Sequence, residues 1–402
     1  MRILHTADWH LGKNLEGQSR MNEQEQFLND LVLFVEEQKI DLILIAGDVY
    51  DSSNPPARAE KMFYDTLKKL SKDGDRITVV IAGNHDNPER LVAAGPLARE
   101  HGIIMAGTPK TIIPTGDYGK NQVTESGEGY VKLRIGNEKA VIITTPYPSE
   151  KRLNEVLYGE MDSDKERVES YEARLKQLFD ELKIQFEEDA VNLIISHLFV
   201  FGSEESGSER SIQLGGSYLV KSSIFPKEAQ YIALGHVHKP QVVPGSDKRA
   251  RYSGSPLHYS SSEISFEKKL LVVDVTANTE IQVSEFPIKV YKPIEIWRCA
   301  GVGEAIKRCE ENQDKDSFVY LEIETDRFIR EDEIKEMKSL KDDILSIRPI
   351  TKEEKEREEE GRGYQERPFE ELFKEFYLKE RGVEVEEETL HVLMSIVNKE
   401  EE

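Results

Sequence analysis

Five short clusters of Asp, His and Asn constrain this chain more than any other feature, because each follows an apolar run typical of a β-strand. They are Asp8-Trp9-His10, Gly47-Asp48-Val49-Tyr50-Asp51, Gly83-Asn84-His85-Asp86, Ser196-His197 and Gly235-His236-Val237-His238. A single cluster of this kind is more typical of a turn, since Asp commonly forms turns. Metal ligands, however, are sparse in sequence and converge in space, and five of the nine histidines fall in these clusters. Together the five clusters predict a site for two metal ions.

The apolar runs beside these clusters are short and rich in β-branched residues, which is typical of buried strands. The runs are residues 3–6, 42–46, 77–82, 141–145, 191–196, 231–234 and 270–275. Segments with helical spacing of apolar residues lie between several runs, and Asn87 before Pro88 predicts the start of one helix. Strands alternating with helices predict a layered α/β fold, in which ligands gather at the carboxyl ends of strands.

Three parts are expected along the chain. Residues 1–288 form the α/β core, and residues 291–350 form a small α/β cap with the order strand, helix, strand, helix, strand. Residues 351–402 combine a highly charged linker with two amphipathic helices, 368–380 and 386–398, which we interpret as a partner-binding tail.

Composition narrows the class of protein. The formal net charge is −23, and residues 352–402 carry eighteen Glu against nine Lys and Arg, which leaves −14 for the first 351 residues. A nucleic-acid role therefore needs a local basic surface, bound metal ions or a partner. No stretch approaches the roughly 18 apolar residues that span a bilayer, and residues 1–8 run into a strand rather than resembling a signal peptide. With only two cysteines, Cys299 and Cys309, we expect a cytoplasmic protein with reduced thiols.

The residue types in the clusters suit metal binding. Asp8 and His10 are two residues apart, so on an extended backbone both side chains project to the same side. The Asp48 carboxylate has two oxygens, which lets it bridge two cations about 3.5–4 Å apart. Glycines precede several ligands, where a missing Cβ permits a tight turn or a close approach of the backbone. Nitrogen and oxygen donors without thiolate favour Mn²⁺, Mg²⁺, Fe or Zn²⁺.

The charge of such a site indicates its substrate. Two divalent cations with the carboxylates of Asp8 and Asp48 leave net positive charge, for which a phosphate ester is a natural ligand. A hydroxide held between the ions can form near neutral pH and attack phosphorus in line. His85 is expected to assist at the scissile phosphate or the leaving oxygen, and the Asp51 carboxylate to hold its ring in one tautomer.

The motifs Asp-x-His, Gly-Asp-x-x-Asp, Gly-Asn-His-Asp, His and Gly-His-x-His resemble those of the calcineurin-like metallophosphoesterases. More narrowly, the chain resembles the SbcD branch of bacterial nuclease subunits over essentially its full length. Sequences typical of that branch are 5–12, 47–51 with Pro55-Pro56, 207–210, 235–238 and 253–256.

The resemblance implies a ligand set and a catalytic residue. One metal would be bound by Asp8, His10, Asp48 and His238, and the other by Asp48, Asn84, His197 and His236. His85 would be the catalytic histidine, and Mn²⁺ the usual activating ion, with Mg²⁺ as the other possibility. Ser253, Ser255 and His258, which follow the last ligand pair, are candidates for contact with substrate.

The resemblance also implies a function and partners. The chain would be a DNA exonuclease and endonuclease that processes double-strand ends, hairpins and single strands in repair, recombination and replication. It would form a homodimer through the helices near residues 59–70 and 88–99, although Phe63, Leu67 and Leu91 could instead face the protein's own sheet. An SbcC-type ATPase would bind the C-terminal helices, and no membrane role is expected.

Two alternatives stay open. A calcineurin-like phosphodiesterase that acts on small nucleotides would have the same metal ligands, although it would need neither the cap nor the tail. A non-catalytic scaffold of the same fold would be expected to have lost a ligand, and none is missing here. Protein phosphatases of this superfamily place Arg-Gly after the second Asp, whereas Ser52-Ser53 follows Asp51.

Overall fold

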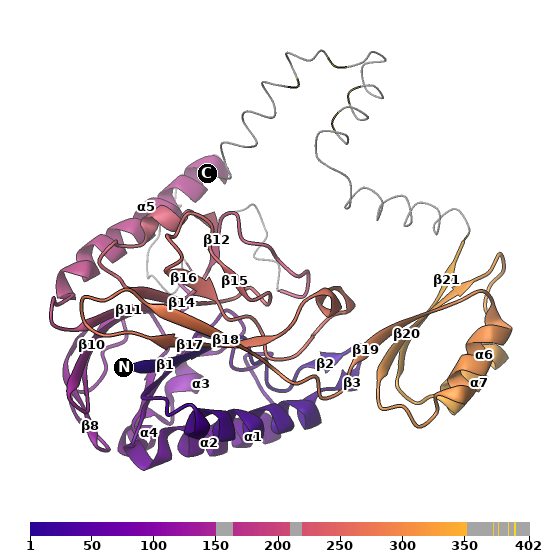
Figure 1. Cartoon of the computed structure of the whole chain (residues 1–402), viewed down its shortest axis with the longest axis horizontal. Helices are drawn as coiled ribbons and strands as arrows, with labels where there is room; N and C mark the ends of the chain where they lie inside the picture. The colour runs from indigo at the N-terminus through magenta and orange to yellow at the C-terminus, as the bar shows by residue number, and fades with distance from the viewer. Residues whose placement is uncertain are drawn as a thin grey trace. The chain divides into compact units, whose positions relative to one another are not determined.

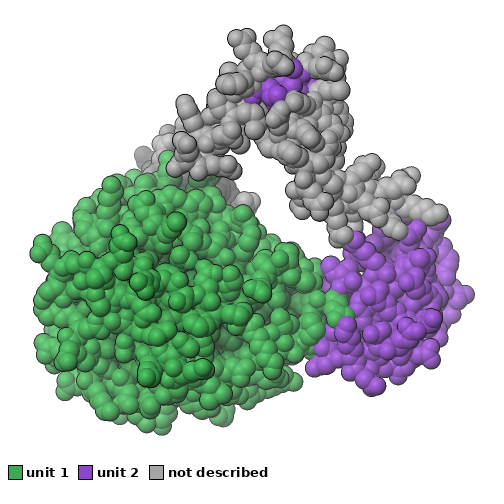
Figure 2. Space-filling view, viewed as in Figure 1, with its two compact units in different colours: residues 1–295 green, residues 296–402 purple. Residues whose placement is uncertain are grey.

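This computed structural model describes residues 1–149, 164–209 and 219–351, together with the single residues 373, 377, 385 and 390. The chain divides into two compact units, Met1–Glu295 and Ile296–Glu402 (Figure 2). The three parts expected from the sequence, 1–288, 291–350 and 351–402, stay a prediction. Among the described residues, no helix is long and apolar enough to cross a membrane.

A six-stranded sheet of the first unit carries three of the five polar clusters. Its strand order is β18-β17-β1-β4-β5-β6, in which β1, β4, β5 and β6 are parallel and β17 is antiparallel to both of its neighbours, β1 and β18. The parallel strands are buried on both faces, which is why their sequences are almost continuously apolar. The strands are β1 (Arg2–Thr6), β4 (Leu42–Ile45), β5 (Ile77–Ile81), β6 (Ile103–Ala106), β17 (Lys269–Asp274) and β18 (Gln282–Pro287).

An eight-stranded sheet carries the other two clusters. Its order is β15-β16-β14-β11-β10-β9-β8-β7, and β10, β11, β14 and β16 are parallel. Buried residues of both sheets form one core, for example Leu42 and Leu44 with Leu193 and Ile195. The strands are β7 (Gly116–Tyr118), β8 (Asn121–Gly127), β9 (Tyr130–Ile135), β10 (Glu138–Thr145), β11 (Val191–His197), β14 (Tyr231–Gly235), β15 (Gln241–Val242) and β16 (Ala250–Tyr252).

Helices cover the outer faces of this sandwich (Figure 1). Phe63 and Leu67 of α2 and Leu91 of α3 are buried in the core that covers the six-stranded sheet. Of the two alternatives left open for these three residues, the one in which they face the protein's own sheet is therefore confirmed, as is ordinary for the apolar face of an amphipathic helix. The predicted start of α3 is confirmed, since the Asn87 side chain accepts a hydrogen bond from the Arg90 amide. The helices are α1 (Met21–Glu37), α2 (Ala57–Ser71), α3 (Pro88–Val92), α4 (Gly95–Ala98) and α5 (Asp164–Leu182).

Short elements complete the first unit. Two two-stranded sheets are formed by β2 with β3 and by β12 with β13. The short elements are β2 (Asn14–Leu15), β3 (Gln18–Ser19), β12 (Phe199–Val200), β13 (Leu219–Val220) and the 3-10 helices η1 (Lys72–Gly74), η2 (Arg99–His101), η3 (Lys183–Gln185), η4 (Ser222–Ile224) and η5 (Ser261–Ser265).

The second unit contains the order of strand, helix, strand, helix, strand that was expected for the cap. A three-stranded sheet, β19-β20-β21, has its own core around Trp297, Val319 and Met337. Cys299 and Cys309 are free thiols buried there. The elements are β19 (Ile294–Cys299), α6 (Val302–Glu311), β20 (Phe318–Glu324), α7 (Glu331–Leu340) and β21 (Ile344–Ile350). The predicted linker 352–360 and helices 368–380 and 386–398 lie outside the described residues, apart from the three single positions 373, 377 and 390.

Candidate metal centre

The loops at the carboxyl ends of the two sheets bring the five polar clusters together. Backbone hydrogen bonds first join two loops of the six-stranded sheet, from Asp8 N to Gly47 O at 3.0 Å and from His10 N to Asp48 O at 3.0 Å. The other sheet is then joined to them, because the His236 amide donates to the Asp8 carboxylate at 2.9 Å. The clusters thus form one site between the two sheets.

The backbone of this site is strained in a way that the sequence did not indicate. Four of the predicted ligands have positive φ, namely Asp8 at 54°, His10 at 45°, Asp48 at 48° and His236 at 106°. The expectation of an extended backbone at Asp8 and His10 is therefore wrong, and left-handed turns make these side chains converge. Such conformations cost about 1–3 kcal/mol each and persist where surrounding contacts impose them.

Two glycines are required by the same close packing. A Cβ on Gly83 would lie 2.0 Å from Asp48 Oδ1, and a Cβ on Gly235 would lie 1.9 Å from the Ala46 carbonyl oxygen. Neither neighbour can move without moving a predicted ligand or its strand. The prediction that these glycines permit close approach of the backbone is confirmed.

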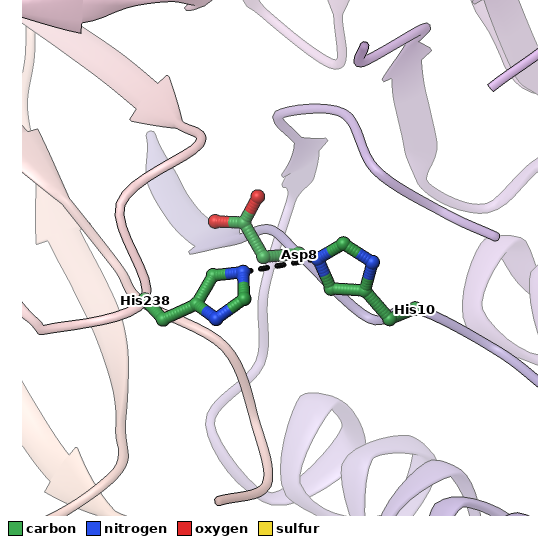
Figure 3. A group of neighbouring side chains, drawn as sticks. All are labelled: Asp8, His10 and His238. Atoms are coloured by element: carbon green, nitrogen blue, oxygen red, sulfur yellow. Dashed lines mark hydrogen bonds between the residues drawn. The ribbon is translucent and has the colours of Figure 1, made fainter. Parts of the chain in front are cut away.

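Asp8, His10 and His238 form the first ligand group (Figure 3). One possible ligand atom from each lies within 4.8 Å of the others, and all three residues are buried. The Nε2 atoms of His10 and His238 are 3.0 Å apart. Figure 3 shows the rings of His10 and His238 facing one another, with the Asp8 side chain beside them.

Asp48, His197 and His236 form the second ligand group, also buried and within the same 4.8 Å. Asn84 joins them, because its Oδ1 lies 2.8 Å from His197 Nε2 and 3.0 Å from His236 Nδ1. His197 Nδ1 donates to the Ala46 carbonyl at 2.9 Å, so Nε2 is the ring nitrogen that faces the group.

The Asp48 carboxylate belongs to the second ligand group and also lies close to the first. Its Oδ2 is 3.7 Å from His10 Nε2 and 3.4 Å from His197 Nε2. Its Oδ1 accepts a hydrogen bond from the His85 amide at 2.9 Å, which holds the carboxylate in place. This is the arrangement expected of a carboxylate that bridges two metal ions.

The donor set fits divalent cations. His10 Nδ1 and His236 Nε2 are buried nitrogens without a hydrogen-bond partner among the described residues. Burial lowers the pKa of His10, and that of His236 to about 3, so both imidazoles are neutral near pH 7, as ligands must be. Burial also opposes charge on His197, but Asp48 and Asp8 raise its pKa to about 9. The donors are nitrogen and oxygen only, a set that suits Mn²⁺ or Mg²⁺.

The catalytic candidates His85 and Asp51 lie beside this centre, but not in the predicted arrangement. His85 Nδ1 donates to the main-chain oxygen of Asp51 at 2.7 Å. The Asp51 carboxylate instead lies 2.9 Å from Lys13 Nζ and 3.6 Å from His10 Nδ1. The main-chain oxygen thus orients the His85 ring, and His85 Nε2 lies 3.9 Å from Asp48 Oδ2.

The three candidates for substrate contact are held in internal contacts. Ser253 and Ser255 are fully buried, and the Ser255 hydroxyl donates to the Leu257 carbonyl while accepting from Lys268. His258 Nε2 contacts the Phe266 carbonyl oxygen at 3.0 Å. Their positions support a role in the protein's own packing.

Some neighbours of the ligands were missed or underestimated from the sequence. The Asp86 carboxylate accepts hydrogen bonds from the amides of Gly83, Val49 and Tyr50, so it joins two ligand loops. Glu263 and Lys268 form a buried ion pair beside His238, although no motif marks them. Burial opposes the charge of Glu263, but Lys268 and His238 hold its pKa well below the usual range.

Comparison with known proteins gives matches over most of the chain. Residues 1–240 match the family model described as calcineurin-like phosphoesterase, and residues 290–381 match the type 5 capsule protein repressor C-terminal domain. The SbcD subunit of the nuclease SbcCD from Bacillus subtilis (strain 168) is 39% identical over 391 residues, covering 97% of this chain and 96% of that relative. The protein of the same name from Rhodobacter capsulatus is 30% identical over 347 residues, covering 82% of each chain.

Proposed function

The chain belongs to the calcineurin-like phosphoesterase family, and from that membership we propose that it is the DNA-cleaving nuclease component of an SbcCD-type complex. It is a phosphodiester hydrolase of that family, and its nearly full-length similarity to nuclease subunits supports DNA as substrate. Both exonuclease action on double-strand ends and endonuclease action on hairpins and single strands belong to the proposal.

The observation that carries the proposal is that Asp48 belongs to the second ligand group and also lies close to the first. We assign Asp8, His10, Asp48 and His238 to one ion and Asp48, Asn84, His197 and His236 to the other. Both groups are complete, which favours an enzyme over a scaffold that has lost its metals. We propose Mn²⁺ as the activating ion, with Mg²⁺ as the alternative.

When bound, the two cations supply a nucleophile near neutral pH and positive charge against the phosphate. The chain's residues hold the reacting groups in place. Because His85 Nδ1 donates to Asp51 O, its Nε2 is the atom free to face the phosphate or the leaving oxygen. We propose that His85 stabilises the transition state there. The Asp51 carboxylate accepts a hydrogen bond from Lys13 Nζ and lies 3.6 Å from His10 Nδ1, so it is the main-chain oxygen of Asp51, and not its carboxylate, that orients His85.

The proposal is tested by cleavage of linear duplex and hairpin DNA by the purified chain. We expect cleavage with Mn²⁺, its loss in excess chelator and its return when Mn²⁺ is restored, because the proposed reaction depends on metal-activated water. A cyclic or linear dinucleotide offered in parallel tests the small-nucleotide alternative. Hydrolysis of the dinucleotide alone would contradict the DNA assignment.

The homodimer remains part of the proposal, with a changed contact residue. Phe63→Asp would place a charge in the core, so it cannot report on pairing. Leu97 of α4 lies in the same predicted region and is 73% exposed. We expect Leu97→Asp to halve the mass measured by light scattering without loss of fold, because a charge in an apolar interface is costly. Ile184→Asp, at a residue 76% exposed on η3, is the matched control and should leave a dimer. An unchanged dimer mass for Leu97→Asp would place the interface elsewhere.

We further propose that the ATPase partner binds residues 361–402. The sequence of this tail places apolar residues at helical spacing, as in segments that dock in a groove of a partner. An SbcC-type ATPase as partner accords with the names of the relatives, and a cytoplasmic location at the nucleoid would follow from it.

A further inference from the structure

His238 differs from the other proposed histidine ligands in what contacts its second ring nitrogen. His197 donates to a main-chain carbonyl, and the second nitrogens of His10 and His236 have no hydrogen-bond partner among the described residues. His238 Nδ1, in contrast, lies 2.5 Å from the Ser208 hydroxyl and 3.4 Å from the Glu263 carboxylate. One metal ligand is thus connected to a buried charge.

The direction of these hydrogen bonds follows from which of the contacting groups can donate a proton and which can only accept one. Lys268 Nζ donates to Glu263 Oε2, and this buried ion pair keeps Glu263 as an acceptor only. The Ser208 hydroxyl contacts Glu263 Oε1 and must therefore donate to it. A hydroxyl has one proton, so Ser208 can only accept from His238 Nδ1. His238 must then carry its proton on Nδ1, and its Nε2 keeps the lone pair that faces His10 and Asp8.

Further contacts fix this arrangement in space. Lys268 Nζ also donates to the His238 carbonyl at 3.0 Å and to the Ser255 hydroxyl at 2.8 Å. The Glu209 carboxylate accepts from the amides of His238 and Ser208, at 2.9 and 3.1 Å. The ligand, the hydroxyl and the ion pair are thereby held against one another, although they come from three distant parts of the sequence.

We propose that Glu263, acting through the Ser208 hydroxyl, is a positioning residue that fixes the tautomer of His238 and so sets the affinity of one of the two metal ions. The other ion is held by His197 and His236, whose second nitrogens make no hydrogen bond to a carboxylate among the described residues, so its affinity is independent of Glu263. This inference rests on the proposed two-metal site and adds to it a selective control of one ion.

Glu263→Gln tests the inference because it should reverse the hydrogen-bond chain. Lys268 needs an acceptor and takes the amide oxygen, so the amide nitrogen donates to Ser208, which then donates to His238 Nδ1. The proton of His238 moves to Nε2, the ligating atom. In calorimetric titration with Mn²⁺, we expect one site to weaken by about 10–100-fold and the other to stay unchanged. In the metal-free protein, ¹⁵N NMR of His238 should show the proton on Nδ1 in wild type and on Nε2 in the variant.

Two further variants separate positioning from folding. Ser208→Ala breaks the chain but leaves the ion pair, so it should weaken the same site even if Glu263→Gln does not fold. Glu23→Gln is the matched control, because Glu23 and Arg20 form another buried ion pair, 2.7 Å apart, at the start of α1. It should leave both Mn²⁺ affinities unchanged.

The outcomes distinguish the inference from the function on which it rests. Unchanged Mn²⁺ affinities in folded Glu263→Gln and Ser208→Ala would overturn the role of Glu263 alone. Equal weakening of both sites in the Glu263 and Glu23 variants would also overturn it, since the pair would then act only through stability. A wild-type chain that binds no Mn²⁺ would instead contradict the proposed function.

Discussion

Asp48→Ala is expected to abolish DNA cleavage and to disturb both metal ions. Its carboxylate belongs to the second ligand group and also lies close to the first, within 3.7 Å of a histidine of each. Loss of one preorganised group that stabilises transition-state charge costs on the order of 10²–10³ in turnover. Because Asp48 serves both ions, we expect a loss of at least about a thousandfold, with Mn²⁺ binding at both sites weakened.

The measurement is the rate of cleavage of linear duplex DNA, together with Mn²⁺ binding by calorimetry. Asp65→Ala is the control, because Asp65 is an exposed carboxylate that pairs with Lys61 on the surface of α2. It should match wild type in both assays. An Asp48→Ala chain that still bound two ions with wild-type affinity would show that Asp48 is no bridge.

His85→Gln is expected to separate chemistry from metal binding. His85 belongs to neither proposed ligand set, and its ring is held by the Asp51 main-chain oxygen with Nε2 toward the centre. Acid–base or hydrogen-bond assistance of this kind contributes typically 10²–10⁴-fold. We therefore expect a rate lower by about that factor, with both Mn²⁺ affinities retained.

The same two assays decide the role of His85. His101→Gln is the matched control, because His101 is a surface histidine that pairs with Asp73 away from the centre. It should cut DNA at the wild-type rate. If His85→Gln cut equally fast with both ions bound, His85 would have no catalytic role; if it lost the ions, it would be a ligand.

Much of the fold could be predicted from the sequence, because the central strands are short apolar runs that end in polar clusters. The carboxyl ends of parallel strands meet at one edge of a sheet, so residues such as Asp8 and Asp48 were expected to converge, and the structure brings them together. The alternation of strands and helices in the second unit could be predicted equally well, because apolar residues recur with a different spacing in strands and in helices.

Other features depend on contacts that no local pattern reveals. The contact of His85 with a main-chain oxygen could not be foreseen, because sequence patterns describe side chains and not the path of a loop. The apolar face of α2 looks the same whether it packs on its own sheet or on a second copy. Glu263 and Lys268 are distant from Ser208 and His238 in sequence, and their residue types are ordinarily exposed. Such buried pairs become visible only when the tertiary contacts are known.

The central claim is that one buried site holds two ions bridged by Asp48. Anomalous scattering from a crystal of the chain grown with Mn²⁺ tests it most directly. We predict two peaks about 3.5–4 Å apart, one beside Asp8, His10 and His238 and one beside Asn84, His197 and His236, with Asp48 in contact with both. A single peak, or manganese bound away from these seven side chains, would contradict the account.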